Sequence, residues 1–176
     1  MKPGIVIVAL AAMALAIVAT ADTQAKAWGS WHGMSLRLAG SSFVVSTEAD
    51  GTIKELPPFT SIQNGIAKGK HGRAQFRAQT VAGIPEFDPE NCPEGLPLRG
   101  PLTATFVLTY NDGSILSGVT GGDNHYCTDG LGLNFADFGG SITGGDRRFE
   151  GATGTWQASG LIDAARVTVE LDIDLD

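Results

Sequence analysis

The chain has 176 residues, of which 43% are hydrophobic and 18% charged, a balance typical of one globular domain with a sizeable core and not of a disordered protein. Its net charge of −7 argues against nucleic acids and anionic membrane surfaces as partners. The 24 glycines are spread along the sequence, which indicates many turns, bulges and strand ends.

The first residues have the pattern of an export signal. Lys2 supplies a positive start, residues 5–18 are apolar or small without a break, and Ala19-Thr20-Ala21 has the small-x-small pattern of a signal peptidase site. A second candidate cleavage site follows Ala27. We therefore expect a signal peptide over residues 1–21, a secreted or periplasmic protein, and one domain over residues 28–176.

An uncleaved membrane anchor is the alternative interpretation of this segment. The stretch over residues 5–21 is at the lower limit of the roughly 17–25 residues that a spanning helix needs. It is rich in alanine, and no cluster of lysine or arginine follows it. We favour export with cleavage, and we expect no stable membrane insertion of the mature chain.

Most of the remaining sequence alternates between apolar and polar residues with the period of a β-strand. The clearest case is residues 166–176, where valine, leucine and isoleucine occupy the odd positions and mainly acidic residues the even ones. The next clearest is a hairpin, in which Asn111-Asp112-Gly113 joins strands over 102–110 and 115–119. The other expected strands cover residues 35–47, 61–68, 73–80, 131–138, 140–143 and 151–159.

Turn residues and a long irregular stretch separate these strands. Gly139-Gly140 and Gly144-Gly145-Asp146 are expected turns, and residues 146–150 could form a single helical turn. Residues 81–101 contain five prolines at a spacing of four, which predicts a long loop over the domain instead of a central strand. About eight short strands at regular spacing are typical of a sandwich or a barrel, and we expect an all-β, antiparallel barrel.

The two cysteines, Cys92 and Cys127, are the only ones in the chain. Export favours a disulfide between them, which would tie the proline-rich loop to residues 121–130. Two independent buried thiols are the alternative. A zinc site is not expected, because the chain has no CxxC motif and only three histidines.

One segment resembles a known family. Residues 142–156 read ITGGDRRFEGATGTW, which resembles the TGGtGrFxGAxG signature of the allene oxide cyclase and dirigent group. The resemblance implies an eight-stranded antiparallel barrel with a central apolar cavity. In this interpretation Phe149 plugs one end of the barrel, and Gly151 and Gly154 allow close approach of the backbone. Asp146 stands where the group usually has threonine, and no catalytic residue is carried over.

Chemistry-bearing motifs are otherwise absent from the sequence. There is no serine elbow, phosphate loop, HExxH or dinucleotide fingerprint, so we expect no cofactor and no metal. The most polar cluster lies in residues 121–130, where Asp123, His125, Tyr126 and Asp129 could perform acid–base chemistry or bind a metal, although the spacing is not that of an EF-hand and the ligands are few. A surface turn held by a disulfide explains the same residues and is the preferred interpretation.

The barrel interior is the other candidate site. An eight-stranded barrel has room for its own side chains or for one small ligand. The expected lining mixes small and aromatic residues, with Tyr110 as the inward polar group: Phe76, Ala104, Phe106, Leu108 and Tyr110. A filled core explains this mixture almost as well.

Three functions therefore remain open at this point. The first is a secreted barrel that binds a small apolar molecule. The second is a cofactor-independent cyclase, isomerase or dirigent-type enzyme that uses the cavity as a mould. The third is a filled barrel with a structural or surface-interaction role. The sequence does not decide whether the protein is an enzyme, and a homo-oligomer is compatible with all three.

Overall fold

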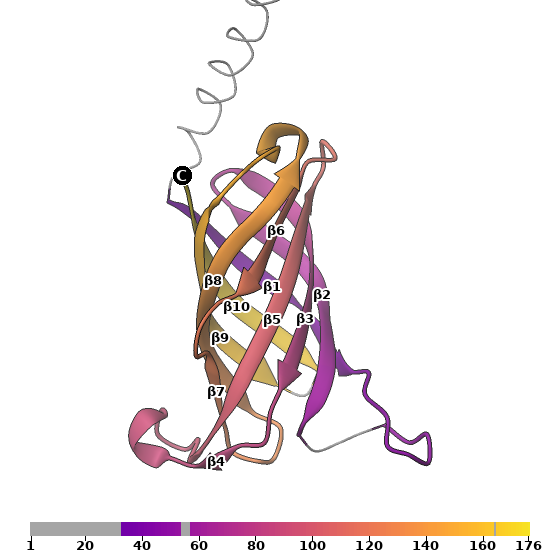
Figure 1. The fold of residues 1–176 in the computed structure, drawn as a ribbon, viewed down its shortest axis with the longest axis vertical. Coiled ribbons are helices and arrows are strands. Elements are labelled where there is room, and N and C mark those ends of the chain that lie inside the picture. The colour runs from indigo at the N-terminus through magenta and orange to yellow at the C-terminus, as the bar shows by residue number, and fades with distance from the viewer. Residues whose placement is uncertain (1–32, 54–56, 164) are drawn as a thin grey trace, which may run out of the picture.

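The computed structural model describes residues 33–53, 57–163 and 165–176, which form an all-β barrel (Figure 1). The expected signal peptide over residues 1–21 lies outside the described residues. The strands run in chain order as β1 (Met34–Val44), β2 (Phe59–Gly69), β3 (Gly72–Ala82), β4 (Glu86–Phe87), β5 (Leu98–Tyr110), β6 (Ile115–Thr120), β7 (His125–Thr128), β8 (Asn134–Asp146), β9 (Gly154–Asp163) and β10 (Arg166–Leu175). Two short 3-10 helices, η1 (Pro89–Asn91) and η2 (Arg147–Phe149), complete the described elements.

Eight strands close the barrel. Their order is β3-β2-β1-β10-β9-β8-β6-β5, and β5 then pairs with β3. All of these pairings are antiparallel, and the closing ladder runs from Ala74 opposite Tyr110 to Ala82 opposite Leu102. Closure removes the unpaired edges that an open sheet would expose. The expected antiparallel barrel is confirmed.

Strand β10 has the two-faced character that its sequence indicates. Val167, Val169, Leu171, Ile173 and Leu175 are all buried in the barrel core, whereas the residues between them are exposed. Side chains alternate across a strand, so one face enters the core and the acidic face meets water. The predicted hairpin between β5 and β6 is present too, with Leu108 opposite Leu116.

Strands β6 and β7 occupy one position in the barrel wall, one after the other. Both pair with β5 on one side and β8 on the other. The side chain of Asn124 holds the interruption between them: its Nδ2 donates to the carbonyls of Gly121 (2.6 Å) and Gly139 (3.1 Å). Its Oδ1 accepts from the Gly139 N–H at 2.8 Å. Residues 125–128 of the expected polar loop are therefore strand β7 of the barrel wall.

Three expected boundaries were wrong. Strand β8 runs without a break from Asn134 to Asp146, so neither Gly139-Gly140 nor Gly144-Gly145-Asp146 is a turn. Glycine allows close packing of neighbouring strands at such positions: a Cβ at Gly140 would overlap the Val119 carbonyl, and one at Gly145 would overlap the Ile115 carbonyl. Strand β5 begins at Leu98, so the last residues of the expected proline-rich loop belong to the barrel. Pro101 is tolerated there because it lies beside the interruption between β6 and β7, where Leu102 donates to the Asn124 carbonyl.

The two ends of the barrel differ. One end carries the β2–β3 and β5–β6 turns and η2, and Phe149 of η2 is fully buried there against Tyr110, with ring centroids 5.3 Å apart. The other end carries the connections β1–β2, β3–β5, β7–β8 and β9–β10, including the long loops in the lower part of Figure 1. We call these the plugged end and the mouth.

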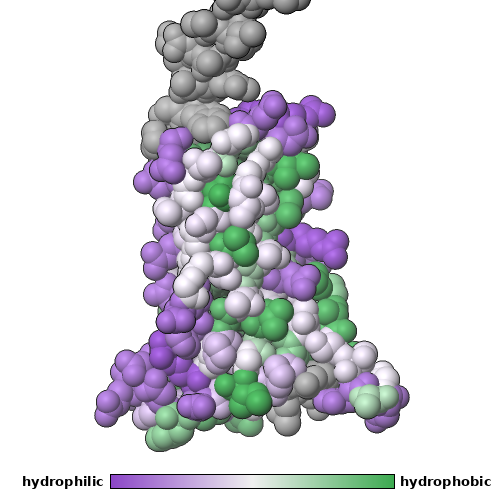
Figure 2. Space-filling model, in the orientation of Figure 1, coloured by the Kyte–Doolittle hydropathy of each residue, from purple (hydrophilic) through white to green (hydrophobic). Residues whose placement is uncertain are grey.

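The outer surface is uneven in polarity. Acidic side chains cover β10, whereas the outer face of β5 is uncharged between Thr103 and Thr109. Figure 2 shows a pale to green strip between purple margins on the face in view. No helix among the described residues is long and apolar enough to cross a membrane.

Candidate functional site

The interior of the barrel contains an apolar cavity at mid-height, which we call the deep cavity. Its volume is about 40 Å³, and no ionisable side chain lines it among the described residues. Four of the five residues expected at a pocket line it, namely Phe76, Ala104, Phe106 and Leu108. The void exists because small side chains from three strands, Ala78, Ala104 and Ala158, reach the same cavity.

An aromatic cluster forms one wall of the deep cavity. The ring of Trp156 lies 5.1 Å from that of Phe106 and 5.6 Å from that of Phe138, both in edge-to-face geometry. The indole N–H of Trp156 donates to the carbonyls of Val119 and Ser141, each at 3.2 Å. The polar atom of Trp156 is therefore occupied by the barrel wall, and the cavity retains an apolar lining.

A second cavity of about 90 Å³ lies towards the mouth, and we call it the chamber. It shares Gln63, Thr80 and Ile162 with the deep cavity, so the two are neighbours along the barrel axis. Three buried polar side chains, which we call the polar belt, line it: Ser61, Gln63 and Thr80. Ser61 Oγ and Thr80 Oγ1 are 2.7 Å apart, and Gln63 Nε2 donates to both, at 2.7 Å and 3.0 Å.

The chamber leads to a wider hollow at the mouth. This hollow has a volume of about 470 Å³ and shares Val44, Phe59, Tyr126 and Asn134 with the chamber. The loops around this end expose large apolar side chains, with Phe87 75% exposed and Leu131 91% exposed. Three cavities of increasing volume thus follow one another from mid-barrel to the mouth.

The buried Tyr126 helps to form the mouth. It points inward from β7, and its hydroxyl donates to the Gly83 carbonyl at 2.9 Å. Burial raises the pKa of Tyr126 to about 12. At neutral pH this hydroxyl is protonated and hydrogen-bonded, so Tyr126 acts as a strut between β7 and the β3–β4 connection.

Tyr110 is buried as expected, but it lies at the plugged end and does not line the deep cavity. Its hydroxyl donates to Met34 Sδ at 3.4 Å, and the Arg148 guanidinium lies 4.2 Å from its ring centroid. Burial raises the pKa of Tyr110 to about 12, although the positive charge of Arg148 opposes the rise. Both the hydroxyl and the ring of Tyr110 have partners within the protein. The structure therefore gives no support to the expected contact between Tyr110 and a ligand.

The four residues of the expected polar loop do not converge on one point. Tyr126 points into the barrel, and its neighbour His125 points outward, because successive side chains of a strand face opposite ways. Asp129 Oδ1 accepts from the N–H groups of residues 131, 132 and 133, which holds the β7–β8 turn and lowers the pKa of this carboxyl. Asp123 is exposed on the β6–β7 connection.

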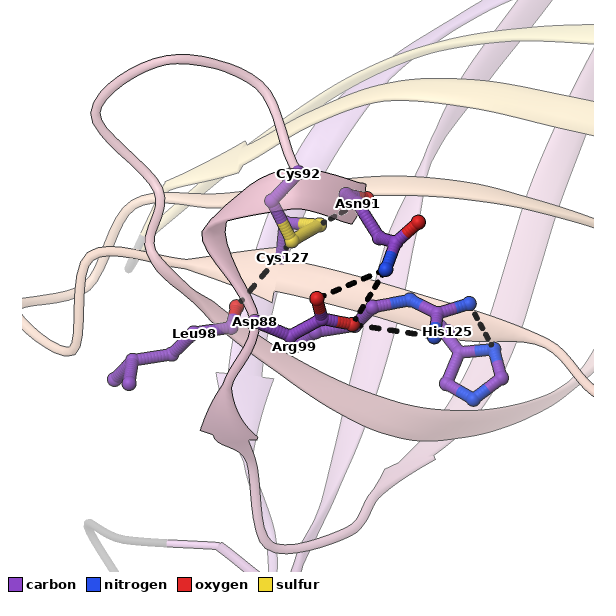
Figure 3. Close-up of polar contacts among 7 residues, drawn as sticks. All are labelled: Asp88, Asn91, Cys92, Leu98, Arg99, His125 and Cys127. Carbon is purple, nitrogen blue, oxygen red and sulfur yellow. Dashed lines mark hydrogen bonds and ion pairs between the residues drawn. A yellow bond between two sulfur atoms is a disulfide. The ribbon is translucent and has the colours of Figure 1, made fainter.

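His125 belongs to a small polar cluster beside the disulfide (Figure 3). Arg99 Nη2 lies 3.0 Å from His125 Nδ1, and this nitrogen is the acceptor of the contact, since arginine can only donate. Arg99 also pairs with Asp88 at 3.6 Å, and Asp88 accepts from Asn91. A groove of about 270 Å³ runs past Arg99 and His125 on the outer surface. The cluster fastens η1 to β5 and β7.

The expected disulfide between Cys92 and Cys127 is present, with Cα atoms 5.7 Å apart. It ties the η1 segment to β7, in agreement with the expected link between the two loops. Within the described residues, no three histidine, cysteine or acidic side chains gather in an arrangement that could hold a metal ion.

Comparison with known proteins adds no relative. No protein-family model matches the chain, and the search of curated proteins finds none that matches its sequence.

Sequence reasoning missed the polar belt. The strand over residues 61–68 was expected, but no inner face was assigned to it. The structure turns Gln63, Gly65 and Ala67 inward, and Ile62 is buried but lies outside the core cluster. The signal available in advance was the alternation of small residues at Ser61, Gly65 and Ala67, since the interior of an eight-stranded barrel leaves little room for side chains.

Proposed function

We propose that this protein is an exported barrel that binds a small apolar molecule in its interior. The observation that carries the proposal is the row of three cavities, which leads from an apolar, aromatic-walled cavity to a wide mouth. The plugged end closes the opposite side with Phe149. A ligand would enter at the mouth and place its apolar part against Phe106 and Trp156.

The cavity volumes limit the ligand to a small molecule. One water molecule occupies roughly 10–15 Å³ on the same scale. The deep cavity and the chamber, at about 40 and 90 Å³, therefore accept roughly ten non-hydrogen atoms between them. Molecules of this size include substituted benzenes and medium-chain or cyclic terpenoid skeletons.

The lining favours binding over acid–base catalysis. Among the described residues, no ionisable side chain lines the deep cavity, and no polar atom is exposed on its surface. Two ionisable residues line the chamber, and both have partners within the protein: the hydroxyl of Tyr126 donates to the Gly83 carbonyl, and Asp163 Oδ1 accepts from the Ala165 N–H. A mould-type enzyme of the allene oxide cyclase or dirigent kind remains the alternative; the motif over residues 142–156 and the eight-stranded barrel support it.

Two further features agree with an exported binding protein. The disulfide suits an oxidising compartment, and the apolar start of the chain suits a signal peptide. The negative net charge disfavours nucleic acid as a partner.

The test is a pair of leucine substitutions on neighbouring residues of β5. Ala104→Leu fills the deep cavity, whereas Thr103→Leu adds a similar side chain on the exposed outer face. Protein purified from its own host is analysed by native mass spectrometry for a retained molecule. Binding of added cyclohexanol, a probe of seven non-hydrogen atoms, is measured by calorimetry.

We expect wild type and Thr103→Leu to bind cyclohexanol. The affinity of Ala104→Leu should be at least tenfold lower, although circular dichroism should show that this variant is folded. Equal binding by both variants would place the ligand outside the deep cavity and refute the proposal. A retained molecule that is released chemically altered after incubation would favour the mould-type enzyme.

A further inference from the structure

The outer wall of the barrel carries a basic face, although the net charge of the protein is −7. Strands β1, β2 and β3 and the β2–β3 turn contain no aspartate or glutamate. Five exposed cations lie there: Arg37, Lys68, Lys70, Arg73 and Arg77. Within the part of the chain that the structure describes, no carboxylate forms an ion pair with any of them. A concentration of positive charge on an acidic protein indicates a surface for a negatively charged partner.

An acidic row borders this basic face at the same height. In β10, Glu170 and Asp172 are exposed on the outer face, and Asp174 continues the row. Glu170 lies opposite Arg37 of β1, and Arg37 lies opposite Lys68 of β2. Neighbouring strands are about 4.8 Å apart, so the acidic row is only about 5–10 Å from these two cations. One wall of the barrel, behind β5 in Figure 1, therefore carries both signs of charge side by side.

A wall of this kind is complementary to a second copy of itself. A two-fold axis parallel to the strands, between β1 and β10, places the basic side of each copy over the acidic side of the other. Arg37 and Lys68 of one copy then face Glu170 and Asp172 of the other. The other outward side chains of β1 at this height and below it are small: Ser35, Ala39 and Ser41. Small side chains let the two walls approach closely enough for the charged groups to meet.

We propose that two copies of this chain associate side by side through this wall, with Arg37 and Lys68 of each copy bound to Glu170 and Asp172 of the other. Four strands over six residues give a contact of about 400 Å² per copy, half of the roughly 800 Å² that a stable interface buries. The dimer is therefore weak and depends on charge. Both mouths point the same way and stay open, so this inference and the proposed function stand or fall separately.

The first test is the salt dependence of self-association. Sedimentation velocity is measured on the protein purified from its own host, over a series of protein concentrations. We expect the dissociation constant of the dimer to rise at least about tenfold between about 0.01 and 1 M salt, because the screening length falls from about 30 Å to about 3 Å. This measurement needs no variant, so it decides the matter even if a variant does not fold.

The second test reverses one sign of charge at a time. One variant carries Arg37→Glu and Lys68→Glu, and the other carries Glu170→Lys and Asp172→Lys; circular dichroism checks that both are folded. Each alone should remain monomeric, because like charges then face each other. An equimolar mixture should form the heterodimer, since every contact again joins opposite charges. The second variant has its net charge reduced from −7 to −3, so general repulsion between copies would predict the opposite, stronger association.

The matched control is Thr103→Glu with Thr109→Glu, which adds charge to the exposed outer face of β5, beyond β3. This control should associate as wild type does. A wild type that is monomeric at low salt, or a dimer that salt does not weaken, would overturn the proposal. A mixture of the two reversed variants that stays monomeric would overturn it as well. Binding of heparin by a monomeric wild type would instead assign the basic face to an anionic polymer.

Discussion

Removal of the disulfide should destabilise the protein by an amount that the loop length sets. The bridge between Cys92 and Cys127 closes a loop with a sequence separation of 35 residues. The chain-entropy model gives about 4 kcal/mol for a loop of this length at 25 °C, since the bridge restricts the unfolded chain. Strand β7 keeps its ladders to β5 and β8 without the bridge, so the barrel itself should persist.

The assay is urea unfolding of the oxidised wild type and of the Cys92→Ala, Cys127→Ala double variant, followed by circular dichroism. We expect the free energy of unfolding of the variant to fall by about 4 kcal/mol. For a domain of this size that corresponds to a melting temperature lower by roughly 8–16 °C. Reduced wild type is the control and should match the variant.

The reasoning fails if the double variant loses less than about 1 kcal/mol while its urea dependence stays unchanged. The unfolded chain would then gain little freedom from the missing bridge, contrary to the entropy argument. Hydrogen exchange adds a local readout: residues 88–97 should exchange faster in the variant, because the bridge and the Asp88–Arg99 pair hold that segment together.

Three further predictions concern the plug, a close approach of the backbone, and the tyrosines. Phe149→Ala should lower the free energy of unfolding, measured by heat or urea, by about 3–5 kcal/mol, because loss of the fully buried ring leaves a cavity beside Tyr110. A decrease of less than about 1 kcal/mol would contradict the role of Phe149 as the plug. Gly154→Ala should cost about 1–3 kcal/mol, since Gly154 has φ +141° and a Cβ would overlap the Asp174 carbonyl. Gly121→Ala, whose Cβ would have its nearest neighbour at 3.8 Å, is the control and should be nearly neutral. The absorbance of the two tyrosines at 295 nm should titrate near pH 12 in the folded protein and near pH 10 in denaturant, because burial raises both pKa values. The unfolded chain then loses its phenolic protons first, so the free energy of unfolding should fall as pH rises from about 10 to 12; a folded-state titration at pH 10 would show that the rings are accessible.

The sequence predicted the barrel and much of the cavity lining, but it misplaced the boundaries that depend on neighbouring strands. The alternation in residues 166–176 and the Asn111-Asp112-Gly113 turn are local signals, and both were confirmed. Gly139-Gly140 looked like a turn, because nothing in the local sequence shows that another backbone passes against these two residues. Likewise, His125 and Tyr126 are adjacent in sequence but lie on opposite faces of one strand.

By itself, the sequence determined the all-β class, the inner face of β10 and the one pair of cysteines available to bond, because these follow from period-two patterning, turn chemistry and the count of thiols. The tertiary structure decided which end of the barrel is plugged, where alanines from three strands leave a void, and that the cysteines form a disulfide. Barrel closure brings strands distant in sequence to the same height on the axis, and the volume and polarity of the interior depend on that register.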